Sequence, residues 1–117
     1  MNKLLCMAFA LVGILAISSS TSLAHPPGKA QVSHNKKDGI LVVSIPHSVK
    51  DPNSHYVEHV MATKNGKTVI DAKFNKQSSK GRQDMMGLEF PVKPGDKIVV
   101  KAKCNVAGDS VLEYTVR

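Results

Sequence analysis

Strong turn signals divide the chain into short apolar runs. Asn65-Gly66, the strongest short hairpin signal, separates residues 56–63 from residues 68–74. Pro94-Gly95-Asp96 and Gly108-Asp109 separate the later runs in the same way. None of the runs continues with the period of an amphipathic helix. Short runs between regularly spaced turns therefore predict an all-β domain.

The run that ends at Cys104 shows the clearest strand pattern. Apolar residues on one face alternate with more polar ones on the other over residues 98–104, as expected of a half-buried strand. Further strands are expected at 40–45, 85–91 and 111–116. We predict an immunoglobulin-like antiparallel β-sandwich of about seven strands, without the paired cysteines of antibody domains.

The first 24 residues have the pattern of a secretory signal peptide. Lys3 precedes an apolar stretch from Leu4 to Ile17, and small residues follow as far as Ala24. The apolar stretch of about 14 residues is shorter than the roughly 20 that a membrane span needs, so a retained anchor is the weaker alternative. We therefore predict a signal peptide at 1–24 and one domain at 25–117. Such a protein is exported, periplasmic or secreted, with no membrane association after cleavage.

The charge balance favours small anions over nucleic acid as partners. The chain has 16 Lys and Arg residues against 9 Asp and Glu residues, which gives a formal net charge of +7. The lysines are scattered, and few aromatic residues in 25–117 offer a stacking surface for bases. An ordinary solvated surface is the alternative interpretation, but nucleic acid is not an expected partner.

The cysteines exclude an internal disulfide in the predicted mature domain. Cys6 lies within the predicted signal peptide, which leaves Cys104 as the single thiol of residues 25–117. In an oxidising compartment such a thiol persists if it is buried, bound to a metal or paired with another chain. Cys104 is therefore either a core residue or a candidate ligand.

Histidines are concentrated in the first half of the predicted domain. All five precede residue 60, and neutral imidazoles together with a thiolate suit iron, zinc and copper. A single histidine on a β-sandwich is more often solvated or hydrogen-bonded than metal-bound. The five are His25, His34, His47, His55 and His59.

Four short motifs resemble the iron domain of the desulfoferrodoxin and superoxide reductase family. Ile45-Pro46-His47 resembles the family's Pro-His step, and His55-Tyr56-Val57-Glu58 resembles its His-Tyr-Ile-Glu segment. Cys104-Asn105 is similar to the start of its Cys-Asn-x-His-Gly segment. His25-Pro26-Pro27 matches the His-x-Pro step of its first ligand in form and spacing.

The resemblance implies a mononuclear non-haem iron, a set of site residues and an activity. The carried-over ligands are His25, His47, His55 and Cys104, whereas Ala107 stands where the family has its fourth histidine. The implied activity is an oxidoreductase reaction, one-electron reduction of superoxide to hydrogen peroxide, with an unidentified electron donor. This activity requires that iron be bound.

Loss of the fourth histidine leaves alternatives open. Three imidazoles and one thiolate are closer to the preferences of zinc or copper, which favours an exported, non-catalytic carrier of copper, zinc or iron. His59 follows His55 on the same expected face but about 13 Å away, so it is a candidate ligand only if the strand bulges. The amine of a new terminus at His25 is another candidate donor. Alternatively, Cys104 is simply buried and the histidines bind nothing.

Overall fold

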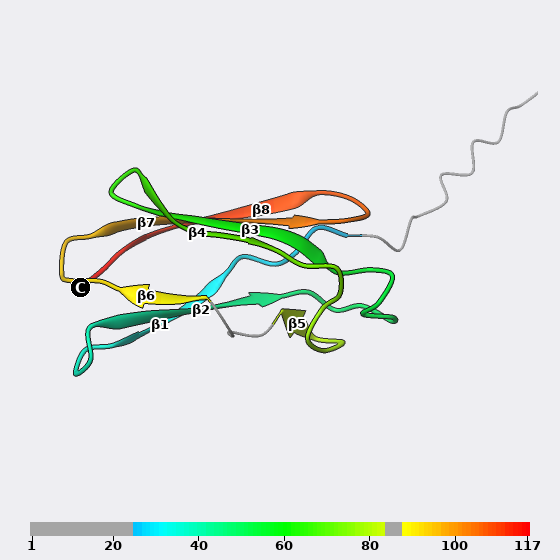
Figure 1. Cartoon of the computed structure of the whole chain (residues 1–117), viewed down its shortest axis with the longest axis horizontal. Helices are drawn as coiled ribbons and strands as arrows, with labels where there is room; N and C mark the ends of the chain where they lie inside the picture. The colour runs from blue at the N-terminus through cyan, green and yellow to red at the C-terminus, as the bar shows by residue number, and fades with distance from the viewer. Residues whose placement is uncertain (1–24, 84–87) are drawn as a thin grey trace, which may run out of the picture.

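Residues 25–83 and 88–117 are described by the computed structural model, and they form two antiparallel sheets that lie face to face (Figure 1). The predicted signal peptide at 1–24 lies outside the described residues. In the described ranges, no helix is long and apolar enough to cross a membrane. The strands there are β1 (Gln31–Asn35), β2 (Ile40–Pro46), β3 (Val57–Lys64), β4 (Lys67–Lys73), β5 (Arg82–Gln83), β6 (Glu89–Pro91), β7 (Lys97–Cys104) and β8 (Asp109–Thr115).

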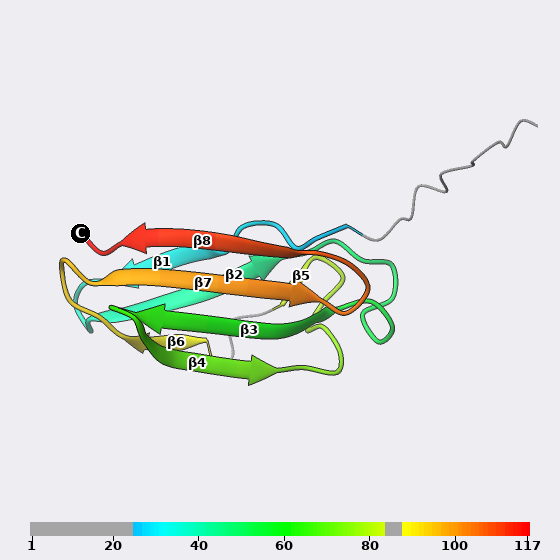
Figure 2. The same cartoon turned by 90° about the horizontal axis from the view of Figure 1, so that it is seen from above.

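The two sheets differ in regularity. The first has the order β1-β2-β5, with β6 also paired to β2, whereas the second has the order β4-β3-β7-β8 (Figure 2). All of the pairings are antiparallel. The predicted all-β, antiparallel class is therefore confirmed. The described residues form eight strands because β1 and the two-residue β5 add to the six runs predicted as strands.

Strand alternation builds the core between the sheets. On β7, Ile98, Val100, Ala102 and Cys104 are buried, as their spacing in the sequence predicts. The facing strand β2 contributes three side chains with no exposed surface, and burial of such side chains contributes about 1.5–3 kcal/mol each. These are Leu41, Val43 and Ile45. The last core residue of β7 is thus also the candidate metal ligand Cys104.

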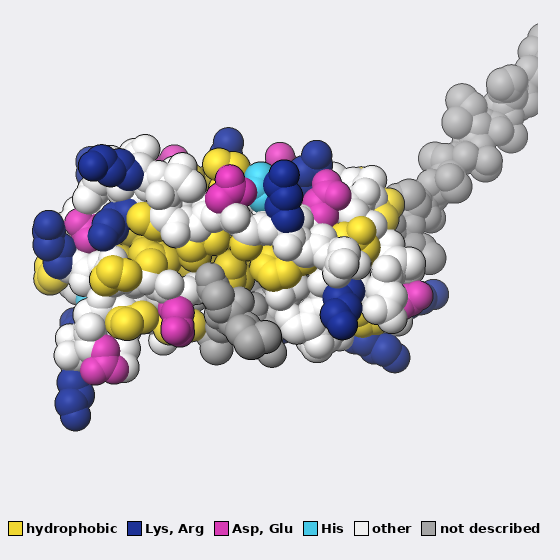
Figure 3. All heavy atoms as spheres, in the orientation of Figure 1, with side chains coloured by type: hydrophobic (Ala, Val, Ile, Leu, Met, Phe, Trp, Pro, Cys, Tyr) yellow, Lys and Arg dark blue, Asp and Glu magenta, His cyan; other side chains and the backbone are white. Residues whose placement is uncertain are grey.

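Apolar and charged side chains occupy different parts of the surface seen from the side of the two sheets. On the face shown in Figure 3, apolar side chains gather in a band between the two sheets. Lys and Arg side chains are spread around this band, with Asp and Glu side chains among them. The positive charge is therefore distributed over this face and forms no single basic patch on it, as the scattered lysines of the sequence predict.

An irregularity in β3 determines which side chains reach the end of the sandwich. The register of β3 on β7 shifts between Val57, which pairs with Cys104, and His59, which pairs with Lys103. Val57 has no exposed surface, whereas His59 and Lys103 are on the outer face of the sheet. The bulge therefore directs the chain just before β3 towards Cys104 and directs His59 away from it.

The predicted ligands come together at one end of the molecule. His47 follows β2, His55 precedes β3 and Cys104 ends β7. These strand ends lie at the right-hand end of Figure 1, where the first described residues also run. Antiparallel order thus brings three segments that are far apart in sequence to the same edge of the two sheets.

Candidate metal centre

His47, His55 and Cys104 form a compact cluster of potential metal ligands. Each offers one ligand atom, and these atoms all lie within 4.8 Å of one another. Donors on one tetrahedral ion with bonds of 2.0–2.3 Å are about 3.5 Å apart, so a small rearrangement would suffice. His47 and Cys104 are each only 2% exposed, and His55 is half-buried. The cluster therefore combines imidazole and thiol groups at a nearly dry site.

His25 adds a third imidazole at the exposed side of the cluster. Its ring centroid lies 5.3 Å from that of His47 and 6.0 Å from that of His55. The His47 and His55 centroids are 4.8 Å apart, and all three pairs meet edge to face. The structure thus gathers the four residues that the family resemblance singled out, with His25 at the opening towards solvent.

Asn105 holds the backbone on both sides of His55. Its side-chain Oδ1 accepts a hydrogen bond from the backbone N–H of Tyr56 (2.8 Å), and its Nδ2 donates to the carbonyl of Ser54 (3.0 Å). Its own backbone N–H donates to the carbonyl of Tyr56 (3.0 Å). The residue next to Cys104 therefore fixes the position of His55 relative to the sulfur.

The turn after β7 places a hydrogen-bond donor on the sulfur. The backbone N–H of Val106 points at Cys104 Sγ (3.3 Å), and the Cys104 N–H donates to the carbonyl of Gly108 (3.0 Å). The sulfur also lies 3.9 Å from Asn105 Oδ1, towards which the thiol donates. The turn thus fixes the position of the sulfur at the end of β7.

His55 is held as a neutral ring. Burial is the main cause that lowers its pKa below the ordinary 6.5, and the neighbouring His47 and His25 lower it further. Its Nε2 is buried and makes no hydrogen bond to any described residue. Buried polar atoms without a partner are rare, and a neutral imidazole nitrogen is a metal donor. Nothing among the described residues satisfies this atom, so it is free to coordinate a cation.

The lowered pKa of His55 predicts acid sensitivity of the metal-free protein. Below pH 6.5 the unfolded chain takes up a proton that folded His55 resists, so the free energy of unfolding falls as pH falls. We expect a lower Tm at about pH 5.5 than at about pH 7.5, with a smaller difference in His55→Gln. Thermal unfolding at both pH values in the presence of a chelator measures this difference in Tm. The control His59→Gln is expected not to reduce the difference, and an unchanged difference in His55→Gln would contradict the prediction.

A strap that precedes β1 carries His25 to the cluster. The Gly28 N–H donates to the carbonyl of Pro46 (2.8 Å), and Ser110 Oγ donates to the Gly28 carbonyl (2.9 Å). Pro26 packs directly on Gly108, where an added Cβ would lie 2.8 Å from the Pro26 Cβ. The strap is therefore attached to both sheets immediately after His25.

We predict that Gly108→Ala displaces this strap. Gly108 has φ +80°, a conformation that costs an L-residue about 1–2 kcal/mol, and the new methyl would also collide with Pro26. Gly66→Ala is the matched control, since Gly66 has φ +86° and an added methyl there would have nothing within 4 Å. Chemical denaturation should show a larger stability loss for Gly108→Ala, and Co²⁺ titration about tenfold weaker binding in that variant alone. Equal losses of stability and of Co²⁺ affinity in both variants would contradict a role of the strap in metal binding.

The structure does not bring the other two histidines to the cluster. His59 Nε2 lies 2.6 Å from Asp71 Oδ1 on the outer face of the second sheet. A bulge is present in β3, but it turns His59 away from His55 instead of towards it. His34 lies on β1 opposite Leu41, and its Nδ1 is buried without a hydrogen bond to a described residue. Neither residue belongs to the group that gathers around Cys104.

Sequence reasoning missed Gln77, which contacts His47. Gln77 is 3% exposed, and its Oε1 lies 2.8 Å from His47 Nδ1. It occupies the polar stretch between β4 and β5, where glutamine has no distinctive pattern. No signal in one sequence identifies this contact across 30 positions.

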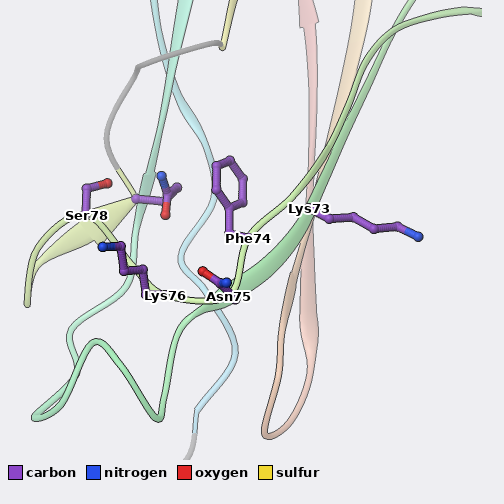
Figure 4. A pocket seen from close by; sticks show the side chains of 6 residues that line it. Lys73, Phe74, Asn75, Lys76 and Ser78 are labelled. Atoms are coloured by element: carbon purple, nitrogen blue, oxygen red, sulfur yellow. The ribbon is translucent and has the colours of Figure 1, made fainter.

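An open pocket of about 480 Å³ lies on the same connection but contains none of the candidate ligands (Figure 4). In Figure 4 the side chain of Lys73 points away from the other lining residues. The chemistry of the lining is amide, hydroxyl and ammonium around one aromatic ring, which provides no set of metal donors. The lining residues are Lys73, Phe74, Asn75, Lys76, Ser78 and Gln83.

Comparisons of the chain with protein-family models, with curated proteins and with solved structures give no match. The His/His/Cys cluster is therefore the observation that bears on function: its three ligand atoms could hold a metal ion, and the donors do not single out which metal.

Proposed function

We propose that this protein is an exported mononuclear metal protein whose ligands are His25, His47, His55 and Cys104, and that with iron it reduces superoxide. The observation that carries the proposal is the buried, unpaired Nε2 of His55 in a cluster whose ligand atoms lie within 4.8 Å of one another. A purely structural thiol would not need imidazoles so placed. The core also does not require them, because its packing is apolar.

The donor set fits a transition metal of borderline softness. Imidazole nitrogen and thiolate sulfur are ligands of iron, zinc and copper, whereas calcium and magnesium require oxygen. Ala107 has no donor atom, so the set is one imidazole short of the desulfoferrodoxin iron. Iron therefore fits the four donors that are present, with a site more open than that of the family.

Convergence of the motifs supports membership of the desulfoferrodoxin and superoxide reductase family, on an immunoglobulin-like sandwich. The motifs are separated by dozens of residues, yet their histidines and Cys104 meet at one end of two facing antiparallel sheets. Motifs that matched the family by chance would not be expected to lie together in the fold. The mature domain in this proposal begins at His25 after export, which agrees with the pattern of the first 24 residues and with a single cysteine thereafter.

In the proposed reaction iron, when bound, supplies the electron that converts superoxide and two protons to hydrogen peroxide. The protein's own groups prepare the site. Burial shields the Cys104 sulfur from water, the N–H of Val106 donates to it, and the lowered pKa of His55 keeps that ring unprotonated. Without Lys3, residues 25–117 have a formal net charge of +6, which attracts a small anion, so the association rate should fall as salt rises.

A non-catalytic metal carrier is the second candidate, and the position of His25 favours it. His25 is exposed and reaches the cluster from a strap, unlike the buried His47. A ligand at the solvent side offers a route by which a metal can be taken up or passed on. The carrier and the enzyme share the site and differ in whether superoxide is consumed.

Metal loading tests the proposal directly. We expect untagged residues 25–117 to bind one Co²⁺ or Fe²⁺ per chain anaerobically, with a sulfur-to-metal absorption band and protection of Cys104 from alkylation. Absence of both effects would exclude the metal centre. Superoxide consumption by the iron-loaded protein, in the presence of a reductant, then decides between the enzyme and the carrier.

A further inference from the structure

Gln77 is a buried amide whose polar atoms all have partners. Its backbone N–H donates to the carbonyl of Pro52 (2.9 Å). Its Nε2 donates to the carbonyls of His47 (2.7 Å) and Ser79 (2.9 Å). Its Oε1 accepts from the backbone N–H of Val57 (3.2 Å) and contacts His47 Nδ1 (2.8 Å). One side chain thus joins the end of β2, the start of β3 and the connection before β5.

Three backbone groups determine the orientation of this amide. A flipped Gln77 would place its oxygen against the carbonyls of His47 and Ser79, and its NH₂ against the N–H of Val57. All three contacts would then be repulsive, since carbonyl oxygen only accepts and N–H only donates. The oxygen of Gln77 therefore faces His47 Nδ1, which must supply the hydrogen of that contact.

We propose that Gln77 is a positioning residue that holds the proton of His47 on Nδ1 and leaves Nε2 as the metal-binding nitrogen. In a neutral imidazole only one nitrogen carries hydrogen, so a donor at Nδ1 requires a lone pair at Nε2. Ligating histidines are usually fixed in this way by a hydrogen bond to the other ring nitrogen. The role of Gln77 in metal binding rests on the proposed metal centre. The position of the His47 ring proton can be measured in the metal-free protein as well.

The surroundings of Nε2 offer a second acceptor that competes for the ring proton, and the shorter contact, 2.8 Å from Nδ1 to Gln77, favours Nδ1. His47 Nε2 lies 3.2 Å from the backbone carbonyl oxygen of His25, the residue that brings the third imidazole. With the proton on Nδ1, a lone pair and a carbonyl oxygen face each other there. Two neighbouring electron-rich atoms are stabilised by a cation at their side. Gln77 thereby makes the metal-free site receptive to a positive ion.

Matched substitutions test this role. Gln77→Met keeps the length of the side chain and removes the acceptor. Gln83→Met is the control, because Gln83 is also buried, at 5% exposed, but its Oε1 has no hydrogen-bond partner among the described residues. We expect Co²⁺ and Zn²⁺ affinity to fall about tenfold in Gln77→Met and to change less than about threefold in Gln83→Met. Equal affinities of wild type and Gln77→Met would overturn the inference.

Nitrogen-15 NMR of the histidine rings in the metal-free protein shows which ring nitrogen carries the proton. This property would not change if Gln77 only supported the fold. We expect His47 to carry its proton on Nδ1 in wild type and to lose this preference in Gln77→Met. The wild-type ring spectrum by itself reports the proton position, so the inference stays testable if Gln77→Met does not fold. A wild-type His47 protonated on Nε2 alone would overturn the inference. Failure of wild type to bind metal would instead overturn the proposed function, whatever the ring spectra show.

Discussion

Cys104→Ser is expected to weaken Co²⁺ and Fe²⁺ binding by more than about 100-fold and to abolish the sulfur-to-metal absorption band. Loss of a residue that merely orients a ligand typically costs 10–100-fold, and Cys104 is the proposed ligand itself. It is also the only donor in the set that brings a negative charge. A serine hydroxyl does not ionise near neutral pH, so it replaces the volume of the thiol without its charge.

The measurement is a metal titration followed by absorbance and by competition with a chelator. His59→Gln serves as the control, because it removes an imidazole that pairs with Asp71 outside the cluster. Its affinity should equal that of wild type. Circular dichroism of the metal-free variants verifies that both sheets remain formed. Retention of wild-type affinity by Cys104→Ser would mean that the metal is held elsewhere or that no specific centre exists.

Ala107→His is expected to raise Fe²⁺ affinity by on the order of 100-fold, or about 2.8 kcal/mol, with a smaller gain for Zn²⁺. Ala107 is exposed, and it lies between Val106, which contacts the sulfur, and Gly108, which contacts the His25 strap. An imidazole from this position would restore the donor that the family has. Iron accepts a fifth ligand, whereas zinc in closed protein sites is almost always tetrahedral. The added ring should therefore shift the preference towards iron.

Val106→His is the matched control for this gain. Val106 is in the same turn and 54% exposed, so a histidine there adds an imidazole without the position of the family residue. Paired titrations with Fe²⁺ and Zn²⁺ should show the gain in Ala107→His only. If the activity is superoxide reduction, the rate of the iron-loaded variant should rise as well. Equal gains at both positions would indicate nonspecific binding by an added histidine.

The local sequence was sufficient to predict the turns and the all-β fold class. Asn65 and Gly66 have φ values of 52° and 86°, as a two-residue hairpin turn requires, and Gly95 also has a positive φ. These turns depend on the conformational preferences of a few adjacent residues. The alternation of β7 was equally predictable, because a strand with one buried face repeats every two residues.

The site was predictable only in part, because its geometry depends on contacts between distant segments. The short motifs identified His47, His55 and Cys104, but spacing alone placed His59 on the face of His55. The bulge in β3 reverses that face, and a bulge has no marker in this sequence. Gln77 reaches His47 across 30 positions, so no local pattern could indicate it.

The candidate ligands belong to different sheets, since His47 follows β2 of the first sheet and Cys104 ends β7 of the second. An ion held by both would cross-link the two layers, as the inter-sheet disulfide does in antibody domains. Closing a loop of about 60 residues by a covalent link removes unfolded-state entropy worth about 4 kcal/mol. Metal loss would then loosen the whole domain. If the protein is exported as proposed, its unfolding would depend on the supply of metal outside the cell.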